Sequence, residues 1–246
     1  MTHNRHLYFL LDIGKEKFVT QDNGSQCPFC NREALSEILD EKDSMLLVKN
    51  KFPTLANTFQ TVLIETNDCS ASISTYDASY LRKVITFGID HWLRMEASGD
   101  FQSVVFYKNH GPLSGGTIDH AHMQIVGLKD IDYRQSLNND MFEGMEIYKE
   151  GNSVLNISTQ PNACSTEFNI ITTPRDDQFM ADNIQKMVKY ILKRCDSYNL
   201  FFYQWKDSII CKIVPRYVTS PFLVGFNIPQ TFTRLGDFVD EVRMGW

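Results

Sequence analysis

Two histidines and a glutamine alternate at His120, His122 and Gln124, close behind a segment rich in small residues. Residues two apart on an extended strand point to the same face, so these three side chains are expected to lie together. The preceding segment, residues 108–117, holds three glycines, whose backbone amides can approach an anion closely. A neutral imidazole that faces a bound phosphate is arranged for attack on phosphorus.

Each member of this motif has a different predicted role. His122 is the predicted nucleophile, while His120 can serve as a metal ligand and fix the local backbone. Gln124 can donate a hydrogen bond to a phosphoryl oxygen. The alternative is that both histidines are ordinary hydrogen-bonded polar groups within a strand. The histidines that are given no catalytic role are His3, His6, His91 on the polar flank of a helix, and His110 in the glycine segment.

Cys27 and Cys30 form a Cys-x-x-Cys pair, which fits either a zinc site or a redox pair. The polar residues 21–26 before it do not resemble the strand that a thioredoxin-like motif requires. Zinc normally takes four ligands, and the best candidates for the other two are Cys69 and His120. The alternative is a pair of ordinary loop cysteines. The cysteines predicted to be buried apolar residues or simple strand positions are Cys164, Cys195 and Cys211.

Asn50 and Phe52 follow an apolar run at residues 45–48. An asparagine after a strand, followed by an aromatic residue, can bind the ribose and base of a nucleoside. The same pattern also fits a turn that begins at the asparagine. The residues alone leave both interpretations open.

The overall composition is that of an ordinary globular protein, with 246 residues, 43% of them hydrophobic, and a formal net charge of −6. No basic run is visible, so nucleic acid and anionic membranes are not expected as primary partners. No stretch approaches the roughly 20 apolar residues of a membrane span, and the apolar patch at residues 7–11 is too short for a signal peptide. A cytoplasmic protein is therefore predicted, in which disulfides are not expected.

The pattern of strands and helices repeats along the chain, which predicts a duplicated α+β fold with halves at residues 1–135 and 136–246. The first half has a predicted helix at 77–98, ended by Gly99, and predicted strands at 58–64, 102–107 and 120–128. The second half has a predicted helix at 181–197, a hairpin over 146–157 that turns at 151–152, and strands at 167–172, 200–204 and 208–214. No histidine follows residue 122, so the second half is predicted to keep the scaffold and lack the chemistry.

The residues from Asn109 through the glycine loop to His120-x-His122-x-Gln124 resemble the signature of galactose-1-phosphate uridylyltransferases and their relatives in the histidine-triad superfamily. That signature is an Asn-x-Gly loop, a small-residue turn and then His-Pro-His-x-Gln. The spacing from the asparagine to the first histidine matches. The resemblance is specific over residues 25–128, and the short chain is most similar to a bacterial branch of the group.

The resemblance implies a duplicated HIT-like α+β fold with helices packed on an antiparallel sheet, and a double-displacement nucleotidyl transfer. His122 would attack the α-phosphorus of a nucleoside diphosphate sugar, form a covalent nucleotidyl-histidine and release sugar 1-phosphate. A phosphate-bearing acceptor would then take the nucleotidyl group from the histidine. Gln124 stabilises charge without shuttling a proton, unlike the third histidine of hydrolytic relatives. The implied partners are nucleotide sugars and sugar phosphates, and a homodimer is a candidate assembly.

The other motif residues fall in the family's order and take implied roles from it. A structural zinc ion is implied at Cys27, Cys30, Cys69 and His120. The implied nucleoside contacts are Asn50 and Phe52, and the implied phosphate contacts are Asn109, Gly115, Gly116 and Thr117.

Three departures from the family pattern matter. Ala121 replaces the usual proline, which removes a fixed φ but no chemistry. Cys69 stands where relatives usually carry a histidine ligand, which gives a Cys₃His set. The second half holds no histidine for a second metal, so that site is predicted to be absent, and its shortened length leaves the sugar specificity open.

Two other functions stay open at the level of the sequence. A nucleotide-sugar or dinucleotide phosphorylase would use the same intermediate with inorganic phosphate as acceptor. A catalytically silent, zinc-containing nucleotide-binding protein would show ligand-induced stabilisation without turnover.

Overall fold

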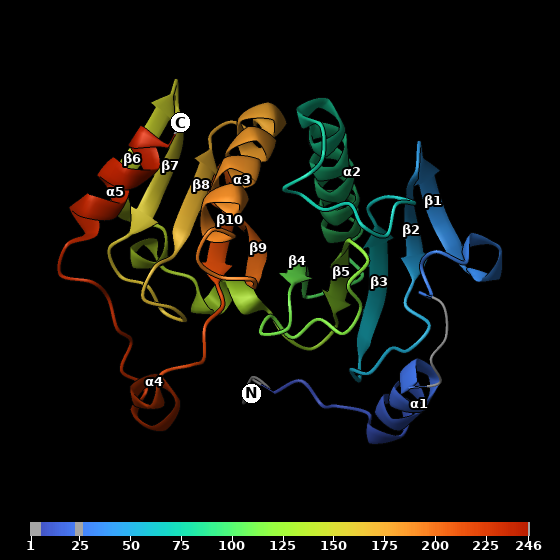
Figure 1. Cartoon of the computed structure of the whole chain (residues 1–246). Helices are drawn as coiled ribbons and strands as arrows, with labels where there is room; N and C mark the ends of the chain where they lie inside the picture. Colours follow the sequence, from blue (N-terminus) through green and yellow to red (C-terminus); the bar gives the residue numbers. More distant parts are fainter. Residues whose placement is uncertain (1–5, 23–26, 246) are drawn as a thin grey trace. The chain divides into compact units, whose positions relative to one another are not determined.

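The computed structural model describes residues 6–22 and 27–245 (Figure 1), so His3 lies outside the described part of the chain. The chain divides into two compact units. The first comprises Met1–Ser72, Phe87–Phe106 and His120–Ser136, and the second comprises Ile73–Thr86, Tyr107–Asp119 and Leu137–Trp246. Among the described residues, no helix is long and apolar enough to cross a membrane.

The sheet of the first unit follows the strand order β1-β2-β3-β5-β4. Its strands are β1 Ile38–Lys42, β2 Met45–Lys49, β3 Thr58–Ile64, β4 Ser103–His110 and β5 His122–Leu128. The predicted strand at 58–64 is confirmed, and the one predicted at 102–107 runs on to His110. The strand predicted at 120–128 begins only at His122, where the antiparallel ladder with β3 ends at Ile64. His120 therefore precedes the strand.

Helix α2, Ala78–Ala97, confirms the helix predicted over 77–98, and Gly99 follows it with a φ of +74°. Within the first unit, Trp92 is fully buried and donates its indole N–H to the carbonyl of Val104 at 2.8 Å. Gly88 permits the close approach of helix to sheet, because a Cβ there would lie 2.5 Å from the Phe106 ring. The part of α2 that belongs to the first unit thus packs against its sheet through Gly88 and Trp92.

His91 corrects the expectation that it lies on the polar flank of this helix. It is buried, 2.9 Å from the carboxylate of Asp40 in β1, and stands edge-on to Phe87. Burial, followed by the charge of Arg94, lowers the pKa of His91. The helical pattern misplaces this residue because no strand is predicted over residues 38–42, which supply its carboxylate partner.

The second unit carries the strand order β4-β9-β10-β8-β7-β6, with β4 contributing to both units. Its strands are β6 Gly144–Glu150, β7 Ser153–Ser158, β8 Phe168–Thr172, β9 Tyr198–Trp205 and β10 Ser208–Pro215. The pairs of β9 with β10, β10 with β8, β8 with β7 and β7 with β6 are antiparallel. The strands and the hairpin predicted for this half are confirmed, and Gly151 turns the hairpin with a φ of +56°.

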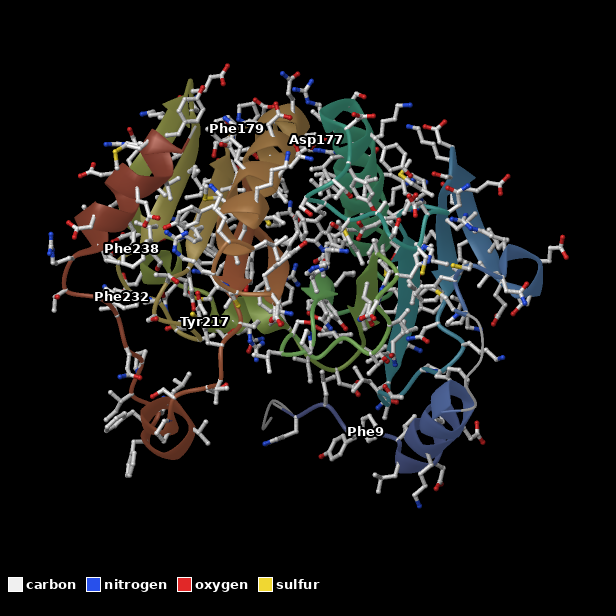
Figure 2. The ribbon with its side chains drawn as sticks, in the orientation of Figure 1. Phe9, Asp177, Phe179, Tyr217, Phe232 and Phe238 are labelled. Atoms are coloured by element: carbon white, nitrogen blue, oxygen red, sulfur yellow. The ribbon has the colours of Figure 1, made fainter. Side chains whose placement is uncertain are left out.

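Helix α3, Asp177–Ile191, packs on β8 and β10 (Figure 1) and both begins and ends earlier than the predicted 181–197. The start is set by Asp176, whose carboxylate accepts the N–H of Phe179 at 2.9 Å as an N-cap. Phe179, labelled with Asp177 in Figure 2, stacks on Tyr148 of β6. The first turn is thus fixed by a polar cap and an aromatic contact that an apolar-stripe pattern does not register.

The elements without a prediction from the sequence are α1 Leu11–Asp22, β1, α4 Pro221–Phe226 and α5 Leu235–Met244. Helix α1 lacks an apolar stripe, which is the signal that marks amphipathic helices. Helix α5 packs on β6, with Val239 and Val242 buried and the Arg243 guanidinium donating to the carbonyl of Ile147 at 2.9 Å. Phe238, also labelled in Figure 2, packs near Phe232.

Candidate functional site

The four predicted metal ligands lie together in the first unit, although 93 residues separate Cys27 from His120. Cys27 and Cys30 share a tight turn, Cys69 follows β3, and His120 precedes β5. Their ligand atoms all lie within 4.8 Å of one another, and His120 Nδ1 is 3.5 Å from both the Cys27 and Cys30 sulfurs. Tetrahedral zinc, with Zn–S of about 2.3 Å and Zn–N of about 2.0 Å, separates sulfur from nitrogen by about 3.5 Å. The cluster is able to bind a metal ion.

The tautomer of His120 suits this cluster. The side chain is fully buried, and its Nε2 lies 2.8 Å from the carbonyl oxygen of Thr66. A carbonyl oxygen only accepts, so Nε2 must carry the proton. The lone pair is then on Nδ1, which faces the sulfurs. A backbone carbonyl on the far nitrogen is the usual way to orient a histidine ligand.

Of the three thiols, the Cys69 thiol has a raised pKa. Burial of the sulfur raises the pKa of the Cys69 thiol to about 12, although the residue as a whole is exposed, and hydrogen bonds with Cys30 and Cys27 act in the same direction. Thiolates crowded in this way need a compensating positive charge, which a divalent metal supplies. The donor set therefore fits a borderline-soft metal such as zinc.

His122 lies at the start of β5 and is only 7% exposed. Its Nδ1 lies 2.8 Å from the carbonyl oxygen of His120, which again can only accept, so Nδ1 carries the proton. The lone pair is then on Nε2, the nitrogen that a nucleophilic imidazole has to offer. Two backbone carbonyls thus hold the two imidazoles in opposite tautomers.

Phe29, inside the Cys-x-x-Cys turn, contacts both imidazoles. Its ring centroid lies 5.8 Å from that of His120 and 5.3 Å from that of His122, edge-on in both cases, and the side chain is buried. The turn that supplies two sulfurs therefore also supplies an apolar wall to the predicted nucleophile. Phe29 has no role predicted from the sequence, and its position between the two cysteines is the only signal that points to it.

The predicted nucleoside contacts and Gln124 are half-buried residues of the first unit. Gln124 pairs with Val62 across the β3–β5 ladder. The side-chain oxygen of Asn50 accepts the backbone N–H of Phe52 at 2.9 Å, which is the geometry of an Asx turn. The turn interpretation of this segment is therefore observed, and the nucleoside role stays a prediction.

The glycine loop belongs to the second unit and leads directly into the histidine motif along the chain. Gly111 has a φ of +80°, and a Cβ there would lie 2.1 Å from the carbonyl oxygen of Asp196. Gly115 has a φ of +87° and faces open space. The Ser114 hydroxyl donates to the carbonyl of Gly111 at 2.8 Å and accepts the N–H of Gly116 at 3.3 Å. One end of the loop is therefore tightly packed while the Gly115 end is open.

Asn199 of β9 holds this loop from within the second unit, and no sequence motif points to it. The residue is 1% exposed, and its Nδ2 donates to Asn109 Oδ1 at 2.7 Å and to the carbonyl of Ser114 at 3.0 Å. Its Oδ1 accepts from the Arg216 guanidinium at 2.8 Å. The available signal is an amide side chain next to the run Leu200–Tyr203 of apolar and aromatic residues, because buried amides need partners. Thr117, the other predicted phosphate contact, is exposed.

His110 closes β4 and stacks on Tyr198, with ring centroids 4.7 Å apart. Burial, followed by the positive charge of Lys108, lowers the pKa of His110. The imidazole is therefore neutral near pH 7, which fits a packing role.

The cysteines outside the cluster differ from one another. Cys211 is fully buried, as predicted. Cys164 and Cys195 are only half-buried, which corrects the prediction for them. The Cys195 thiol contacts the carbonyl oxygens of Ser197 and Arg216, so its polar contacts keep it at the edge of the core.

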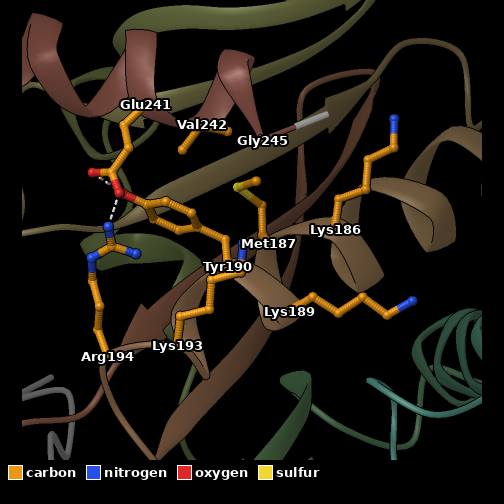
Figure 3. Close-up of a pocket in the computed structure, with 9 residues that line it drawn as sticks. All are labelled: Lys186, Met187, Lys189, Tyr190, Lys193, Arg194, Glu241, Val242 and Gly245. Atoms are coloured by element: carbon orange, nitrogen blue, oxygen red, sulfur yellow. Dashed lines mark hydrogen bonds and ion pairs between the residues drawn. The ribbon is translucent and has the colours of Figure 1, made fainter.

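A hollow of about 420 Å³ lies between α3 and α5 (Figure 3), and none of the predicted site residues lines it. Within it, the Glu241 carboxylate pairs with Arg194 and accepts from the Tyr190 hydroxyl at 3.2 Å. Its other charged lining residues are Lys186, Lys189 and Lys193. Cations near the C-terminus of a helix complement the helix dipole, which accounts for this basic lining without a ligand.

The fold is that of a class of proteins whose solved structures include uridylyltransferases and a phosphorylase. A structure described as a uridylyltransferase matches with a TM-score of 0.72 at 14% identity, over 90% of this chain and 91% of that chain. An ADP-glucose phosphorylase from Arabidopsis thaliana with bound ADP-glucose matches with a TM-score of 0.70 at 16% identity, over 92% of this chain and 93% of that chain. The predicted fold class is thereby confirmed.

Within that class, the chain belongs to the DUF4931 family. Family models described as the N-terminal and C-terminal domains of a "Domain of unknown function (DUF4931)" match residues 9–131 and 134–246. A DUF4931 family protein from Bacillus cereus ATCC 10987 is 46% identical, with a TM-score of 0.77 over 84% of this chain and 98% of that chain. No curated protein matches the sequence.

Proposed function

We propose that this protein is an enzyme that transfers a nucleotidyl group from a nucleoside diphosphate sugar to a phosphate-bearing acceptor. The lone pair of His122 Nε2 attacks the α-phosphorus and forms a P–N bond. The bond from that phosphorus to the bridging oxygen breaks, and sugar 1-phosphate leaves with the electron pair. An oxygen of the acceptor phosphate then attacks the same phosphorus, and cleavage of the P–N bond returns the neutral imidazole.

The observation that carries this proposal is the tautomer of His122. Its Nδ1–H donates to the carbonyl of His120 at 2.8 Å, so in the neutral imidazole the lone pair lies on Nε2. A side chain that is 7% exposed also loses little water when it reacts. Gln124, two residues along the same strand, can donate to a phosphoryl oxygen but cannot act as an acid at neutral pH. A phosphate leaving group needs no such acid.

The other predicted contacts complete the proposed site. The phosphate contacts are assigned to Asn109, Gly115, Gly116 and Thr117, and the nucleoside contacts to Asn50 and Phe52. We assign zinc to the Cys27, Cys30, Cys69 and His120 cluster as a structural ion. Its proposed contribution is to fix the backbone at His120, whose carbonyl orients the nucleophile.

The proposal is tested by incubating the protein with nucleoside diphosphate sugars that carry each common base, followed by intact mass spectrometry. We expect one substrate class to add a single nucleoside monophosphate unit to the protein and to release sugar 1-phosphate. Thermal stabilisation by the same ligands without any adduct would instead mean a nucleotide-binding protein that does not catalyse transfer.

A phosphorylase is the second candidate, because inorganic phosphate can replace the sugar phosphate at the same intermediate. The ADP-glucose phosphorylase from Arabidopsis thaliana shares this fold. Product analysis separates the two functions. When inorganic phosphate is the acceptor, the product is a nucleoside diphosphate. If this product forms faster than the protein transfers the nucleotidyl group to any sugar phosphate, the phosphorylase is favoured.

Phe29→Leu is predicted to slow transfer without loss of metal. Leucine fills much of the buried volume but removes the ring edge that contacts both imidazoles. We expect the rate of adduct formation to fall about tenfold, equivalent to about 1.4 kcal/mol, with an unchanged metal content. The control is Phe101→Leu, which perturbs a stacked pair with Phe59 in the same unit. Equal rate losses in both variants would contradict a specific role for Phe29.

A cytoplasmic location and a homodimer are also proposed. The dimer rests on the family resemblance. Light scattering on the purified protein tests the assembly, and a mass equal to one chain would contradict the dimer.

A further inference from the structure

We infer that Asn199 is a positioning residue that fixes the Asn109 carboxamide with its NH₂ group directed to the ligand phosphate. This inference rests on the proposed function, because it presupposes that the glycine loop binds phosphate. Nothing in the motif itself specifies which end of the Asn109 amide meets the ligand. The hydrogen bonds inside the second unit supply that information.

The first step is that the orientation of Asn199 itself is fixed. Its Oδ1 lies 2.8 Å from the Arg216 guanidinium, which only donates. Its Nδ2 lies 3.0 Å from the carbonyl oxygen of Ser114, which only accepts. A flipped Asn199 would place its NH₂ against the guanidinium and its oxygen against the carbonyl. Because the residue is 1% exposed, water cannot relieve those contacts.

The second step passes this orientation to Asn109. Asn199 Nδ2 also donates to Asn109 Oδ1 at 2.7 Å, so the oxygen of Asn109 is the end that faces β9. Turning the Asn109 amide around would bring two NH₂ groups together. The end that Asn109 can offer to a ligand is therefore its NH₂. Phosphoryl oxygens only accept, so an NH₂ group suits them and a carboxamide oxygen would repel them.

The third step concerns charge. The guanidinium of Arg216, the amide of Asn199 and the amide of Asn109 form one chain in which every donor points toward the loop. Hydrogen bonds aligned in this way polarise one another. A half-buried arginine thus favours an anion at the loop without touching it. The second half of the chain, predicted to have lost the chemistry, would then retain control of how the phosphate is held.

Asn199→Asp tests the inference with almost no change in shape. The carboxylate still pairs with Arg216 but can only accept, so it no longer donates to the Ser114 carbonyl, and Asn109 must turn its NH₂ inward and its oxygen toward the ligand. We expect the affinity for inorganic diphosphate, measured by calorimetry, to fall at least tenfold. We expect the rate of adduct formation at saturating nucleotide sugar to change less than threefold, so the effect falls on KM. The matched control is Asn169→Asp, a buried asparagine of β8 that donates to Asn156 and does not touch the loop.

A double-variant cycle separates positioning from general damage. Asn109→Ala should weaken diphosphate binding, and Asn109→Ala with Asn199→Asp should bind no more weakly than Asn109→Ala alone. Additive losses would mean that Asn199 does not act through Asn109, and would overturn the inference. If Asn199→Asp does not fold, Arg216→Gln replaces it, since it removes only the cation that orients Asn199, and a loss of about threefold or more is expected.

The outcomes also distinguish this inference from the proposed function. If Asn109→Ala weakens diphosphate binding while Asn199→Asp and Arg216→Gln do not, the loop binds phosphate and the inference alone is wrong. If the wild type binds no diphosphate, or Asn109→Ala binds it equally well, the phosphate role of the loop is wrong and the inference falls with it.

Discussion

His122→Ala is expected to form no nucleotidyl adduct with any nucleoside diphosphate sugar, and to lose turnover by about 10⁴-fold or more. Removal of a covalent nucleophile eliminates the two-step route, and the residual rate is that of binding and charge stabilisation alone. Substrate binding should persist, because the side chain is proposed to touch only the reacting phosphorus. The measurement is intact mass after incubation, together with the rate of sugar 1-phosphate release.

The matched control for this variant is His91→Ala. His91 is a histidine of the same unit with nearly the same exposure, 9% against 7% for His122, but it pairs with Asp40. It should keep the adduct even if it lowers thermal stability. An adduct that persists on His122→Ala would overturn the proposed function, as would loss of the adduct on both variants with both proteins folded.

Two backbone carbonyls explain how adjacent histidines can take different roles. Thr66 accepts the Nε2–H of His120, and His120 in turn accepts the Nδ1–H of His122. One imidazole thereby presents Nδ1 to the cysteine sulfurs, and the other is left with its lone pair on Nε2. The carbonyl that orients His122 belongs to the residue in the metal-binding cluster, so the geometry of the cluster and that of the imidazole are linked through a single peptide unit.

The metal cluster could be predicted from the sequence because its ligand types are rare and specific. Cys27 and Cys30 mark a turn, and zinc needs two further donors, for which Cys69 at the end of a strand and His120 are the best candidates. Phe29 and Asn199 could not be found in the same way. Their roles depend on which side chains meet across the folded chain, and phenylalanine and asparagine are common residues with no spacing rule. Only a contact, such as the 2.7 Å hydrogen bond from Asn199 to Asn109, reveals them.

The strands could be predicted better than the ends of the helices. β3 and β10 consist mostly of β-branched and apolar residues. A single polar residue within such a run does not obscure its preference for a strand. The start of α3 depends instead on one hydrogen bond from Asp176, and α1 has no apolar stripe at all. His91 shows a further limit of prediction from sequence. Its partner Asp40 belongs to β1, a strand that is not predicted, so the ion pair could not be expected.

Loss of the metal-binding cluster is predicted to lower the thermal stability of the protein more than any other change proposed for it. Cys30→Ser removes one of three sulfurs and leaves His120 and two crowded thiols without a common cation. Structural zinc contributes on the order of 10 kcal/mol in small peptides, and even half of that in this chain would lower Tm by about 10–20 °C. We expect one zinc ion per wild-type chain by elemental analysis, and little or none in Cys30→Ser. A strong chelator should lower the Tm of the wild type toward that of the variant.

Cys164→Ser is the control, because this half-buried cysteine lies outside the cluster. It should keep its zinc and respond to chelator as the wild type does. Loss of both zinc and Tm in Cys30→Ser would mean that the cluster has a structural role. If the wild type holds no metal, or if Cys30→Ser keeps both its zinc and its Tm, the metal assignment is wrong. The carbonyl of His120 would then orient His122 by hydrogen bonding alone, and Phe29→Leu should cost more than its predicted tenfold, because the aromatic ring would be the main remaining support for both imidazoles.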